Sequence, residues 1–497
     1  MLFKKRAIEK VLLIRPSLKI EHFEHKSLVF PLGLGYIAGV LEKNDYQVKV
    51  LDCLAEGFNN EIKKDKYIIY GLSSAKIKRK IEKFLPDVVG ISCPFSLQYP
   101  FALEVAKITK EVNKEIITIL GGAHPSSVPE EVLKDKEIDF VVIGEGEETI
   151  INLLSALKEN REFNHIDGLG YRIDERIVIN PKTRYIQDLD SIPFPAWHLF
   201  PMEEYFKVNM PHGIDSRPPS TNMITSRGCP ARCIFCSIHS IFGFGYRARS
   251  KDNVISEIEF LKKEYSIKEI QFEDDNLTLD KKRAKEIFKG IIEKKLNISW
   301  TAPNGIALWA LDNELIELMK ESGCRHIALG IESGVQEVLD KVIHKPLNLK
   351  TVKPLIEKLS EVKIKTTAFF VVGFPQETYS QIKNTLRFAL SLPVDDINVY
   401  FATPYPNTEL YNIAKEKGLF TSDFSFNNLK VSKLNLLNKQ LEQKKLERIV
   451  AFTVLLFRFK RILNRPAITL IWIRRISKEK KYALRRLFLL IRKIFFH

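Results

Sequence analysis

Short apolar runs alternate with helical patterns over residues 10–150. The runs are rich in Val and Ile and end in glycine or a small polar residue, which is typical of parallel strands buried on both faces. The predicted strands are 11–16, 47–52, 87–92, 115–122 and 139–146, and the predicted helices are 31–44, 100–112, 129–134 and 147–159. This pattern predicts a doubly wound α/β domain, Rossmann- or flavodoxin-like, over residues 1–160, with its ligand at the carboxyl ends of the strands.

A second alternation of strands and helices begins at residue 221. Its predicted strands are 221–227, 269–276, 299–306, 326–333, 365–373 and 397–406, and each is followed by a loop or helical pattern. Six βα units in a row favour a partial (β/α)6 TIM-like barrel over residues 221–420, with an open sheet as the alternative. Residues 161–220 are irregular and rich in Pro, Asp and Arg, so we expect a linker there, with a small hairpin around 168–180.

The charge of the chain is concentrated in its last part. Residues 430–497 carry 19 Lys/Arg and 3 Asp/Glu, whereas the rest carries 58 of each, so the net charge of +16 belongs to this tail. We therefore expect residues 421–497 to form a basic amphipathic helical region. Long apolar side chains lie between its basic residues, and no apolar run reaches the ~18 residues that cross a bilayer. Contact with a membrane surface is the first interpretation, a helical cap on the barrel the second, and nucleic-acid binding the least favoured.

The cysteines indicate a metal or redox site in a reducing compartment. Three of the six lie between residues 229 and 236, and the other three are Cys53, Cys93 and Cys324. Such spacing is not a disulfide framework. The first residues contain too short an apolar run for a secretory signal, so we expect a cytoplasmic protein. Through its tail, the protein would make peripheral contact with the inner face of the membrane.

One predicted loop supplies three thiolates, from Cys229, Cys233 and Cys236. An iron–sulfur cube has four irons and is usually held by four cysteines, so three ligands leave one iron open for a cofactor or substrate. Phe235 can shield such a cluster. A structural zinc site is the alternative, because His239 could complete a Cys3His set. The loop follows the first strand of a βα array, where such barrels carry their chemistry, and this favours the cluster.

The segment ITSRGCPARCIFCS (224–237) resembles the signature loop of the radical S-adenosylmethionine (SAM) superfamily, CxxxCx(aromatic)C. Later segments extend the resemblance over 221–420, namely FEDDN (272–276), GIESG (330–334), VVGFPQET (371–378) and ATPYPNT (402–408). The resemblance implies a [4Fe-4S] cluster on Cys229, Cys233 and Cys236. It implies SAM-binding positions at Phe235, Glu273, Asp274, Asp275, Asn276, Glu332, Ser333 and Gly373, with Glu332 near the ribose, and substrate-lining positions at Tyr400 and Tyr405. Taken alone, the acidic cluster could cap a helix, Gly373 could be a turn glycine and the tyrosines could be core aromatics.

Four segments of the first domain resemble the cobalamin-binding domain that is fused to many of these enzymes: PLGLGYIAGVLE (31–42), VGIS (89–92), GGAHPSSVPEEVL (121–133) and VIGEGEET (142–149). The implied cobalamin (vitamin B12) positions are Pro31, Gly33, Ser92, Ser96, Gly121, Gly122, His124, Gly144, Glu145 and Gly146. The sequence lacks the DxHxxG string of corrinoid domains with a cobalt-binding histidine. The resemblance therefore implies cobalamin without a protein histidine on cobalt, and His124 as a loop or cofactor-lining residue. A degenerate domain that binds nothing is the alternative.

The resemblance implies an enzyme that cleaves SAM to a 5′-deoxyadenosyl radical and uses methylcobalamin to methylate an unactivated carbon of a small-molecule or lipid-like substrate. An electron donor such as flavodoxin or ferredoxin is the implied partner. Methylthiotransferases and maturases with auxiliary clusters are disfavoured, because this chain lacks the additional cysteines of those enzymes. Two alternatives stay open: a cobalamin-linked radical cyclase or rearrangement enzyme, and a zinc-bearing nucleic-acid-binding protein without enzymatic activity.

Overall fold

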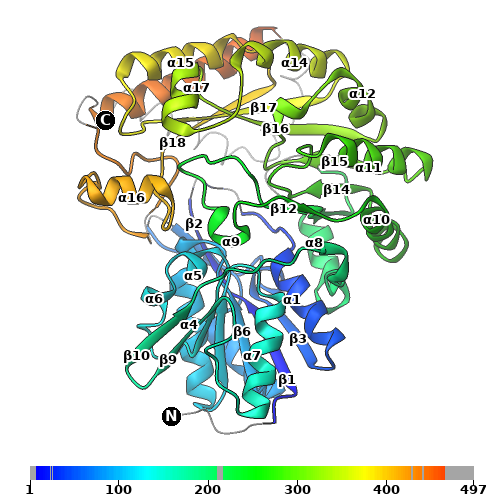
Figure 1. The fold of residues 1–497 in the computed structure, drawn as a ribbon, viewed down its shortest axis with the longest axis vertical. Coiled ribbons are helices and arrows are strands. Elements are labelled where there is room, and N and C mark those ends of the chain that lie inside the picture. The colour runs from blue at the N-terminus through cyan, green and yellow to red at the C-terminus, as the bar shows by residue number, and fades with distance from the viewer. Residues whose placement is uncertain are drawn as a thin grey trace. The chain divides into compact units, whose positions relative to one another are not determined.

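The computed structural model describes residues 7–22, 24, 26–65, 67–209, 216–426, 429–438 and 442–464. The chain forms two compact units, Met1–Pro230 with Ser237–Ile270, and Ala231–Cys236 with Gln271–His497 (Figure 1). The first unit therefore contains the predicted N-terminal domain together with the start of the predicted barrel. The part of the predicted tail beyond Asn464 lies outside the described residues.

The first unit is built on a seven-stranded sheet with the order β10-β9-β8-β7-β6-β1-β3. Five strands are parallel and confirm the five predicted strands: β1 (Lys10–Arg15), β3 (Gln47–Asp52), β6 (Val88–Ser92), β7 (Ile117–Gly121) and β8 (Phe140–Val142). Across the sheet these strands follow one another as second, first, third, fourth and fifth in the chain, which is the flavodoxin-like order. In this order the ligand crevice lies at the carboxyl ends of the strands, beside β1 and β6.

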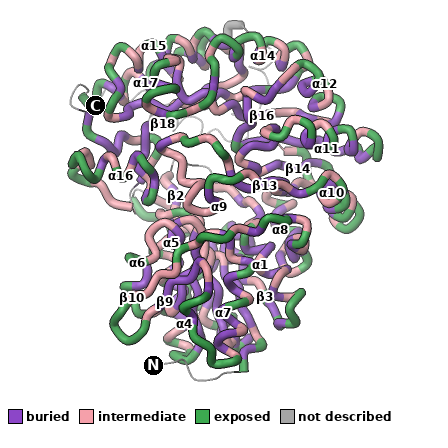
Figure 2. The backbone as a smooth tube through the Cα atoms, viewed as in Figure 1, coloured by how far each residue is buried: buried purple, intermediate pink, exposed green. Residues whose placement is uncertain are grey.

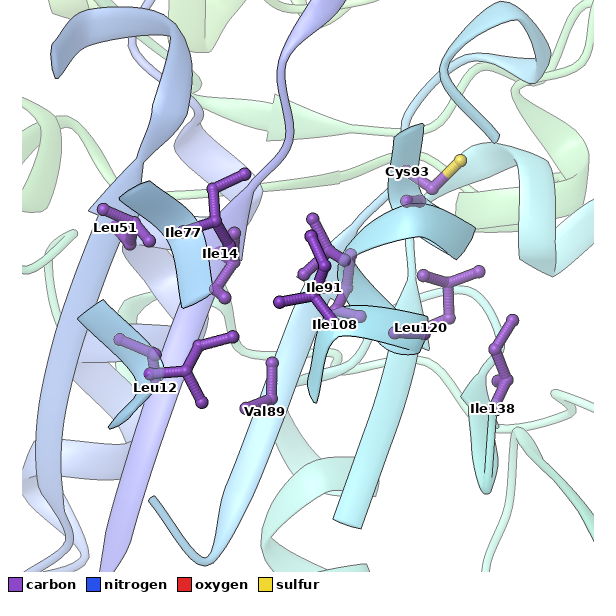
Figure 3. Packing of buried hydrophobic residues seen from close by; sticks show 14 of the residues in the cluster. Leu12, Ile14, Leu51, Ile77, Val89, Ile91, Cys93, Ile108, Leu120 and Ile138 are labelled. Atoms are coloured by element: carbon purple, nitrogen blue, oxygen red, sulfur yellow. The ribbon is translucent and has the colours of Figure 1, made fainter. Parts of the chain in front are cut away.

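Helices cover both faces of this sheet (Figure 1). α1 (Leu32–Lys43) packs beside α7 (Glu147–Glu159), and α3 (Ser74–Phe84) packs beside α4 (Tyr99–Val112). Val89 and Ile91 of the sheet form one apolar core with Ile77 and Ile108 of the helices (Figure 3). Each such buried side chain contributes ~1.5–3 kcal/mol relative to an exposed one. The remaining elements of this part are α2 (Cys53–Glu56), α5 (Ala123–Ser127), α6 (Pro129–Val132) and a small sheet of β2 (Leu18–Glu21), β5 (Tyr67–Tyr70) and β4 (Glu61–Lys63).

Residues 161–209, in the described part of the predicted linker, contain regular elements that pack on this domain. β9 (Leu169–Ile173) and β10 (Arg176–Asn180) form the predicted hairpin and extend the sheet from β8. Further on, Trp197 is fully buried and stacks on Phe30 with ring centroids 4.1 Å apart. The backbone of this segment comes close to α1, because a Cβ at Gly39 would lie 2.7 Å from the Phe194 carbonyl oxygen. Helix α8 (Met202–Val208) follows.

The predicted barrel is a six-stranded sheet with the order β11-β14-β15-β16-β17-β18. Neighbouring strands from β15 to β18 are parallel, as in a partial (β/α)6 barrel. The first six residues of β17 (Lys365–Val372) alternate between exposed or half-exposed and buried, so this strand has one buried face and one partly exposed face, which we call the open face. The strands are β11 (Ser220–Met223), β14 (Glu269–Phe272), β15 (Ser299–Ala302), β16 (Cys324–Glu332), β17 (Lys365–Val372) and β18 (Asp396–Phe401). The main helices are α10 (Lys251–Tyr265), α11 (Lys281–Glu293), α12 (Asn313–Glu321), α14 (Leu349–Glu361), α15 (Tyr379–Ser391) and α16 (Glu409–Glu416). Exposed residues, drawn in green, lie on the surrounding helices α11, α12 and α15 (Figure 2).

Two regions of the barrel depart from regular βα units. The predicted strand 221–227 is broken, because β11 ends at Met223 and β12 (Ser226–Arg227) pairs with β13 (Arg247–Ala248) in a separate antiparallel ladder. After β16, helix α13 (Gln336–Val338) continues into a π-helical turn over Leu339–Ile343 before α14 begins. Both departures lie beside the cysteine loop, the first in sequence and the second through a backbone hydrogen bond.

Helix α17 (Gln443–Asn464) packs one face on the barrel. Its Leu446 and Val450 join a core with Val372, Phe401 and Leu434, so the described part of the tail is a helical cap. The opposite face exposes the large apolar side chains of Phe452, Leu456 and Phe459. Within the described ranges, no helix combines the length and apolar character that spanning a membrane requires.

Candidate active site

The cysteines lie in a loop whose base is closed by the short ladder of β12 and β13, which we call the neck. In the neck Arg227 lies opposite Arg247, and residues 228–246 form the loop between them, with helix α9 (His239–Phe242) inside it. Gly228 has a φ of +85°, and a Cβ there would lie 2.1 Å from the carbonyl oxygen of Gly245. Only glycine fits, because the backbone is left-handed and the opposite strand is in contact.

The tip of the loop, residues 231–236, is fixed by backbone hydrogen bonds within the second unit. The Cys236 N–H donates to the Cys233 carbonyl oxygen over 3.0 Å and forms a tight turn. The Ile234 N–H donates to the Ile343 carbonyl oxygen over 3.1 Å, and the Ile234 carbonyl oxygen accepts from the Leu410 N–H over 2.8 Å. The residues that follow β16 and β18 therefore hold the backbone around two of the three cysteines.

Only the loop cysteines have partly exposed side chains. Cys229, Cys233 and Cys236 are all half-exposed. Cys53, Cys93 and Cys324 are buried in the apolar cores, where burial raises the pKa of each thiol and disfavours the thiolate. Because the thiolate is the metal ligand, the loop carries the thiols that are suited to binding iron.

An iron–sulfur cube and a zinc ion place different demands on the loop cysteines. In a cube each cysteine binds a different iron, so the sulfur atoms need not meet at one point, whereas zinc needs four donors around one ion. No group of three or more His, Cys, Asp or Glu side chains that could hold a metal ion occurs in the part of the chain that the structure describes. His239, the fourth donor of the zinc alternative, has its Nδ1 3.2 Å from the Gly243 carbonyl oxygen and stacks on Phe244. Phe235 lies with its ring centroid 5.9 Å from that of Phe374.

The acidic segment after β14 lies at the carboxyl edge of the barrel sheet. Asp274 and Asn276 are buried, whereas Glu273 and Asp275 are partly exposed. The side chain of Asn304 donates to Glu273 Oε2 over 2.8 Å and to the Glu273 carbonyl oxygen over 3.1 Å. Asn304 follows β15, so this contact ties two neighbouring strand ends together. The sequence analysis missed Asn304, although its place near the end of the predicted strand 299–306 was a signal.

Glu332 ends β16 in a strained backbone conformation. Its φ is +68°, and a left-handed conformation costs a non-glycine residue ~1–3 kcal/mol. The carboxylate lies 3.1 Å from Lys345 Nζ. It also covers Gly330, where a Cβ would lie 2.7 Å from Glu332 Oε1. Such strain concentrates at functional sites, which supports the predicted SAM-binding role of Glu332 and adds Lys345 as its partner.

The next residue, Ser333, is buried and hydrogen-bonded within the protein. Its side chain is buried, and its hydroxyl lies 3.0 Å from Thr385 Oγ1 and accepts from the Val335 N–H over 3.2 Å. The hydroxyl therefore fastens the loop after β16 to helix α15. These contacts hold the side chain within the protein. The SAM-binding position at Ser333 stays a prediction.

A buried carboxyl group that the sequence analysis missed organises the loop after β17. The N–H groups of Gly373 and Phe374 donate to Glu377 Oε2 over 2.7 and 2.9 Å. Gly373 has a φ of +85°, so it is a turn glycine, as the alternative interpretation held. Glu377 is 1% exposed, and burial raises its pKa to about 7 in spite of the two N–H donors, which favour the charged form. The sequence signal for Glu377 was its position four residues after Gly373 in the VVGFPQET segment.

The two predicted substrate-lining tyrosines lie on β18 and in the loop after it. Tyr400 is half-exposed and meets Phe369 edge-on, with ring centroids 5.7 Å apart. Tyr405 is partly buried, and burial raises the pKa of its hydroxyl. On the same face of β17 as Phe369, Thr367 Oγ1 lies 2.8 Å from His326 Nε2. Burial lowers the pKa of His326 to about 4. This face therefore presents aromatic and uncharged polar groups, together with the exposed Lys365 at the start of β17.

Strand ends of the first domain bring several predicted cobalamin positions together. Ser92 pairs with Gly121 across β6 and β7. Gly122 has a φ of +117°, and a Cβ there would lie 2.7 Å from the Cys93 carbonyl oxygen. His124 and Ser96 also meet, with His124 Nδ1 3.0 Å from Ser96 Oγ. His124 is buried, and burial lowers its pKa to about 4, so the imidazole is neutral and faces a protein hydroxyl.

The other cobalamin positions lie where α1 and α7 begin. Pro31 is the N-cap residue of α1, and Gly33 in its first turn has open space where a Cβ would point. Gly144 has a φ of +72° in the turn before α7. Gly146 faces Ile37, because a Cβ there would lie 3.1 Å from its Cδ1. Gly33 therefore has open space beside it, whereas Gly146 serves the packing of α7 on α1.

Glu145 forms ion pairs with the two arginines of the neck. Its side chain is fully buried, Arg247 Nη1 lies 2.7 Å from each of its oxygens, and Arg227 Nη1 lies 3.0 Å from Oε1. Glu147 lies 2.6 Å from Arg227 Nη2. Both carboxylate oxygens therefore have partners in the neck or in the segment beside it. The cobalamin-binding position at Glu145 stays a prediction. The sequence analysis missed the two arginines, one of which stands two residues before the first loop cysteine.

Two family models match the chain, the Radical SAM superfamily over residues 223–389 and the B12 binding domain over residues 24–154. A cytidylyl-2-hydroxyethylphosphonate methyltransferase of Streptomyces wedmorensis is 36% identical over 82% of this chain and 81% of its own. The chain belongs to the cobalamin-dependent radical SAM enzymes. An anaerobic magnesium-protoporphyrin IX monomethyl ester cyclase of Rubrivivax gelatinosus is 29% identical over 82% of this chain and 70% of its own.

Solved structures share the fold of this cobalamin-dependent radical SAM enzyme. The cobalamin-dependent SAM radical enzyme OxsB with aqua-cobalamin bound matches 98% of this chain and 72% of its own with a TM-score of 0.71 and 16% identity. TsrM from Kitasatospora setae, a radical SAM methyltransferase with cobalamin and a [4Fe-4S] cluster bound, matches 84% of this chain and 80% of its own, with a TM-score of 0.66 and 19% identity. The predicted fold class and the predicted cofactors, a [4Fe-4S] cluster, SAM and cobalamin, are thereby confirmed, and the zinc-bearing nucleic-acid-binding alternative is set aside.

Proposed function

We propose that this enzyme transfers a methyl group to an unactivated carbon of a small-molecule substrate. The observation that carries the proposal is the union of the three-cysteine loop and the B12 domain in a chain that is 36% identical to a methyltransferase over 82% of its length. When bound, the cluster supplies the electron that cleaves SAM and cobalamin supplies the methyl group. The protein contributes binding, orientation and the exclusion of water.

In this proposal the second unit and the loop hold SAM and the cluster. Cys229, Cys233 and Cys236 bind three irons and leave the fourth to the cofactor, as at other open metal positions. The segment 273–276 offers carboxylates to the amino group of SAM. The Glu332 carboxylate, held in place by Lys345 at 3.1 Å, suits the two hydroxyls of a ribose.

The first domain holds cobalamin in this proposal. Ser92, Gly121 and Gly122 lie at neighbouring strand ends, where small side chains let a large ligand reach the backbone. Gly33 leaves the first turn of α1 open, and the N–H groups of a helix start favour the phosphate of the nucleotide tail. His124 is buried and faces Ser96, which supports the expectation that this loop places no histidine on cobalt.

The substrate class that we propose first is a nucleotide-conjugated small molecule. Tyr400 and Phe369 offer aromatic surfaces on the open face of the barrel, and His326 with Thr367 offers uncharged hydrogen-bonding groups. The relative from Streptomyces wedmorensis is named for a cytidylyl conjugate. A lipid-like substrate is the second class, and a hopanoid C-3 methylase of Methylococcus capsulatus is 24% identical over 79% of this chain.

Anaerobic reconstitution with iron, sulfide and cobalamin tests this function. We expect the protein, given SAM with a labelled methyl group, to form 5′-deoxyadenosine and to label cytidylyl-2-hydroxyethylphosphonate more than a hopanoid. Cys233→Ala should abolish both products, whereas Cys324→Ala, which changes a buried thiol outside the loop, should retain them. Reconstituted protein that forms 5′-deoxyadenosine in the presence of either substrate class but labels neither would contradict methyl transfer.

A cobalamin-linked radical cyclase is the second candidate function. It is supported by three cyclase relatives that are 26–29% identical over 78–82% of this chain. The same assay separates the two functions, because a cyclase forms 5′-deoxyadenosine and changes its substrate without incorporating the labelled methyl group. A porphyrin monomethyl ester is the probe for this outcome.

We also propose an electron donor of the flavodoxin or ferredoxin type as a partner of this enzyme.

A further proposal is peripheral contact of α17 with an anionic membrane. The exposed Phe452, Leu456 and Phe459 lie on the same helix as the exposed basic residues Lys445 and Arg448, a combination typical of interfacial helices. Co-sedimentation with phosphatidylglycerol vesicles tests the contact. Replacing Phe452 and Phe459 by serine should reduce the bound fraction, and equal binding of both proteins would contradict the proposal.

A further inference from the structure

A buried network of four charges closes the neck of the cysteine loop. Arg227 and Arg247 are register partners in the ladder of β12 and β13, and both bind Glu145. Glu147 adds a second carboxylate on Arg227. All four side chains are at least nine-tenths buried, and all four residues belong to the first compact unit. The turn before α7 in the B12-binding domain therefore forms ion pairs with both strands at the base of the loop, β12 and β13.

Further contacts fix the orientation of the two guanidinium groups. Arg247 donates to the Ile186 carbonyl oxygen over 2.8 Å and to the Phe242 carbonyl oxygen over 3.1 Å. The Ile186 N–H donates in turn to Glu145 Oε2 over 3.0 Å. Arg227 lies over the ring of Tyr36 at 5.3 Å. Glu145 thus has one geometry, in which each of its oxygens accepts hydrogen bonds from the neck or from the segment beside it.

From this arrangement we propose that Glu145 and Glu147 are positioning residues for the iron–sulfur loop. They act through Arg227 and Arg247, hold the two ends of the loop at one separation and balance the charge beside the cluster. The inference rests on the proposal that Cys229 and its neighbours bind the cluster. It goes beyond it by giving the turn before α7 a role in positioning the cluster loop.

The connectivity of the chain keeps the charges of the neck near the first loop cysteine. Arg227 is two residues before Cys229, so their Cα atoms are at most ~8 Å apart. Buried charges at such a distance are little screened by salt. Arg227 forms buried ion pairs with Glu145 at 3.0 Å and with Glu147 at 2.6 Å. Two cations and two anions leave the neck neutral, and removal of one carboxylate leaves a positive charge near the electron acceptor.

Two substitutions with opposite effects on charge test the inference on the full-length protein. Glu145→Gln leaves an uncompensated arginine and should move the midpoint potential of the reconstituted cluster to a more positive value. Arg247→Gln should move it to a more negative value, because Glu145 and Glu147 then face one arginine. The double variant restores charge balance and should return the potential toward that of the wild type.

Hydrogen exchange on the protein without cluster tests positioning independently of cluster chemistry. Peptides that cover residues 224–250 should exchange about tenfold faster or more in Glu145→Gln, because the ladder loses the group that joins its strands. Glu147→Gln removes one contact and should have a smaller effect, which keeps the test open if Glu145→Gln does not fold. Asp52→Asn is the matched control, since Asp52 is a buried carboxylate that pairs with Arg15 in the same unit.

The outcomes separate this inference from the proposed function. Potentials that shift in opposite directions, together with faster exchange in the neck alone, support it. Glu145→Gln and Asp52→Asn proteins with equal neck exchange and unchanged potentials would overturn it, because the network would then be only one more buried ion pair. If wild-type protein bound no cluster, the proposed function would fail, whereas the exchange experiment would still decide whether Glu145 positions the loop.

Discussion

Replacement of Glu377 by glutamine tests whether a protonated carboxyl group holds the loop after β17. Glu377 Oε2 accepts two backbone N–H groups, from Gly373 and Phe374. Its Oε1 is buried and has no hydrogen-bond partner among the described residues. Glutamine keeps an oxygen for the two N–H groups and removes the titration, so the difference between the two proteins isolates the charge.

The magnitude follows from the pKa of the buried carboxyl group. A glutamate ordinarily titrates near 4.5, and burial raises the pKa of Glu377 to about 7. At about 1.4 kcal/mol per pKa unit this difference corresponds to a ~3 kcal/mol change in the free energy of unfolding. The folded protein binds this proton more tightly than the unfolded chain does. The stabilisation is therefore complete below pH 4.5, is lost as the pH rises to about 7, and does not change further above that value.

Urea unfolding of wild type and Glu377→Gln at pH 5, 6, 7 and 8 measures the effect. We expect the free energy of unfolding of the variant, relative to wild type, to increase by ~3 kcal/mol between pH 4.5 and 7.5. Glu357→Gln is the control, because Glu357 is exposed and should run parallel to wild type. A Glu377→Gln curve that also runs parallel to wild type would refute the reasoning, since it would mean that the two N–H donors keep the buried carboxylate ionised.

Three further substitutions have defined outcomes. Gly228→Ala should prevent the neck from closing, since the left-handed φ alone costs ~1–2 kcal/mol and the added Cβ clashes with Gly245, and iron analysis should find most of the cluster lost. Trp197→Ala should lower the free energy of unfolding by ~3–5 kcal/mol, as measured by denaturant titration, because it leaves a cavity beside Phe30. A measured loss below about 1 kcal/mol would contradict this prediction. Glu332→Gln should weaken SAM binding about tenfold in calorimetry of the reconstituted protein, and unchanged affinity would remove Glu332 from the cofactor site.

The order of elements could be read from the sequence because apolar periodicity reports burial directly. The five parallel strands of the first domain are short and rich in Val, Ile and Leu, and the barrel strands alternate with amphipathic helices. The segment 161–220 was harder, because its packing depends on single aromatic residues such as Trp197 and on the space beside Gly39, neither of which has a period. The break between β11 and β12 was also missed, because the neck pairs with a strand some 20 residues further along the chain.

The site residues could be predicted where one short segment carries the chemistry and not where a partner comes from a distant segment. The three cysteines and the acidic segment after β14 stand together in the sequence. Lys345 and Asn304 act through loops that only the fold brings near. Glu377 lies in a segment that was singled out, but its burial could not be read from that segment. A side chain's role also depends on whether its polar atoms are already used, and the Ser333 hydroxyl is used by Thr385.

Glu145 shows why a motif does not by itself distinguish a ligand contact from a structural contact. A carboxylate at the end of a strand in a cofactor-binding domain has the same sequence signature whether it faces the ligand or the protein. The difference is one of electrostatics: two buried guanidinium groups in the neck need counter-charges, and the turn before α7 supplies them. A domain that binds one cofactor can in this way help to position the loop that binds another. When an arginine stands next to metal-binding cysteines, the buried acidic residue that balances its charge should be identified first. Only the acidic residues that remain should then be considered as ligand contacts.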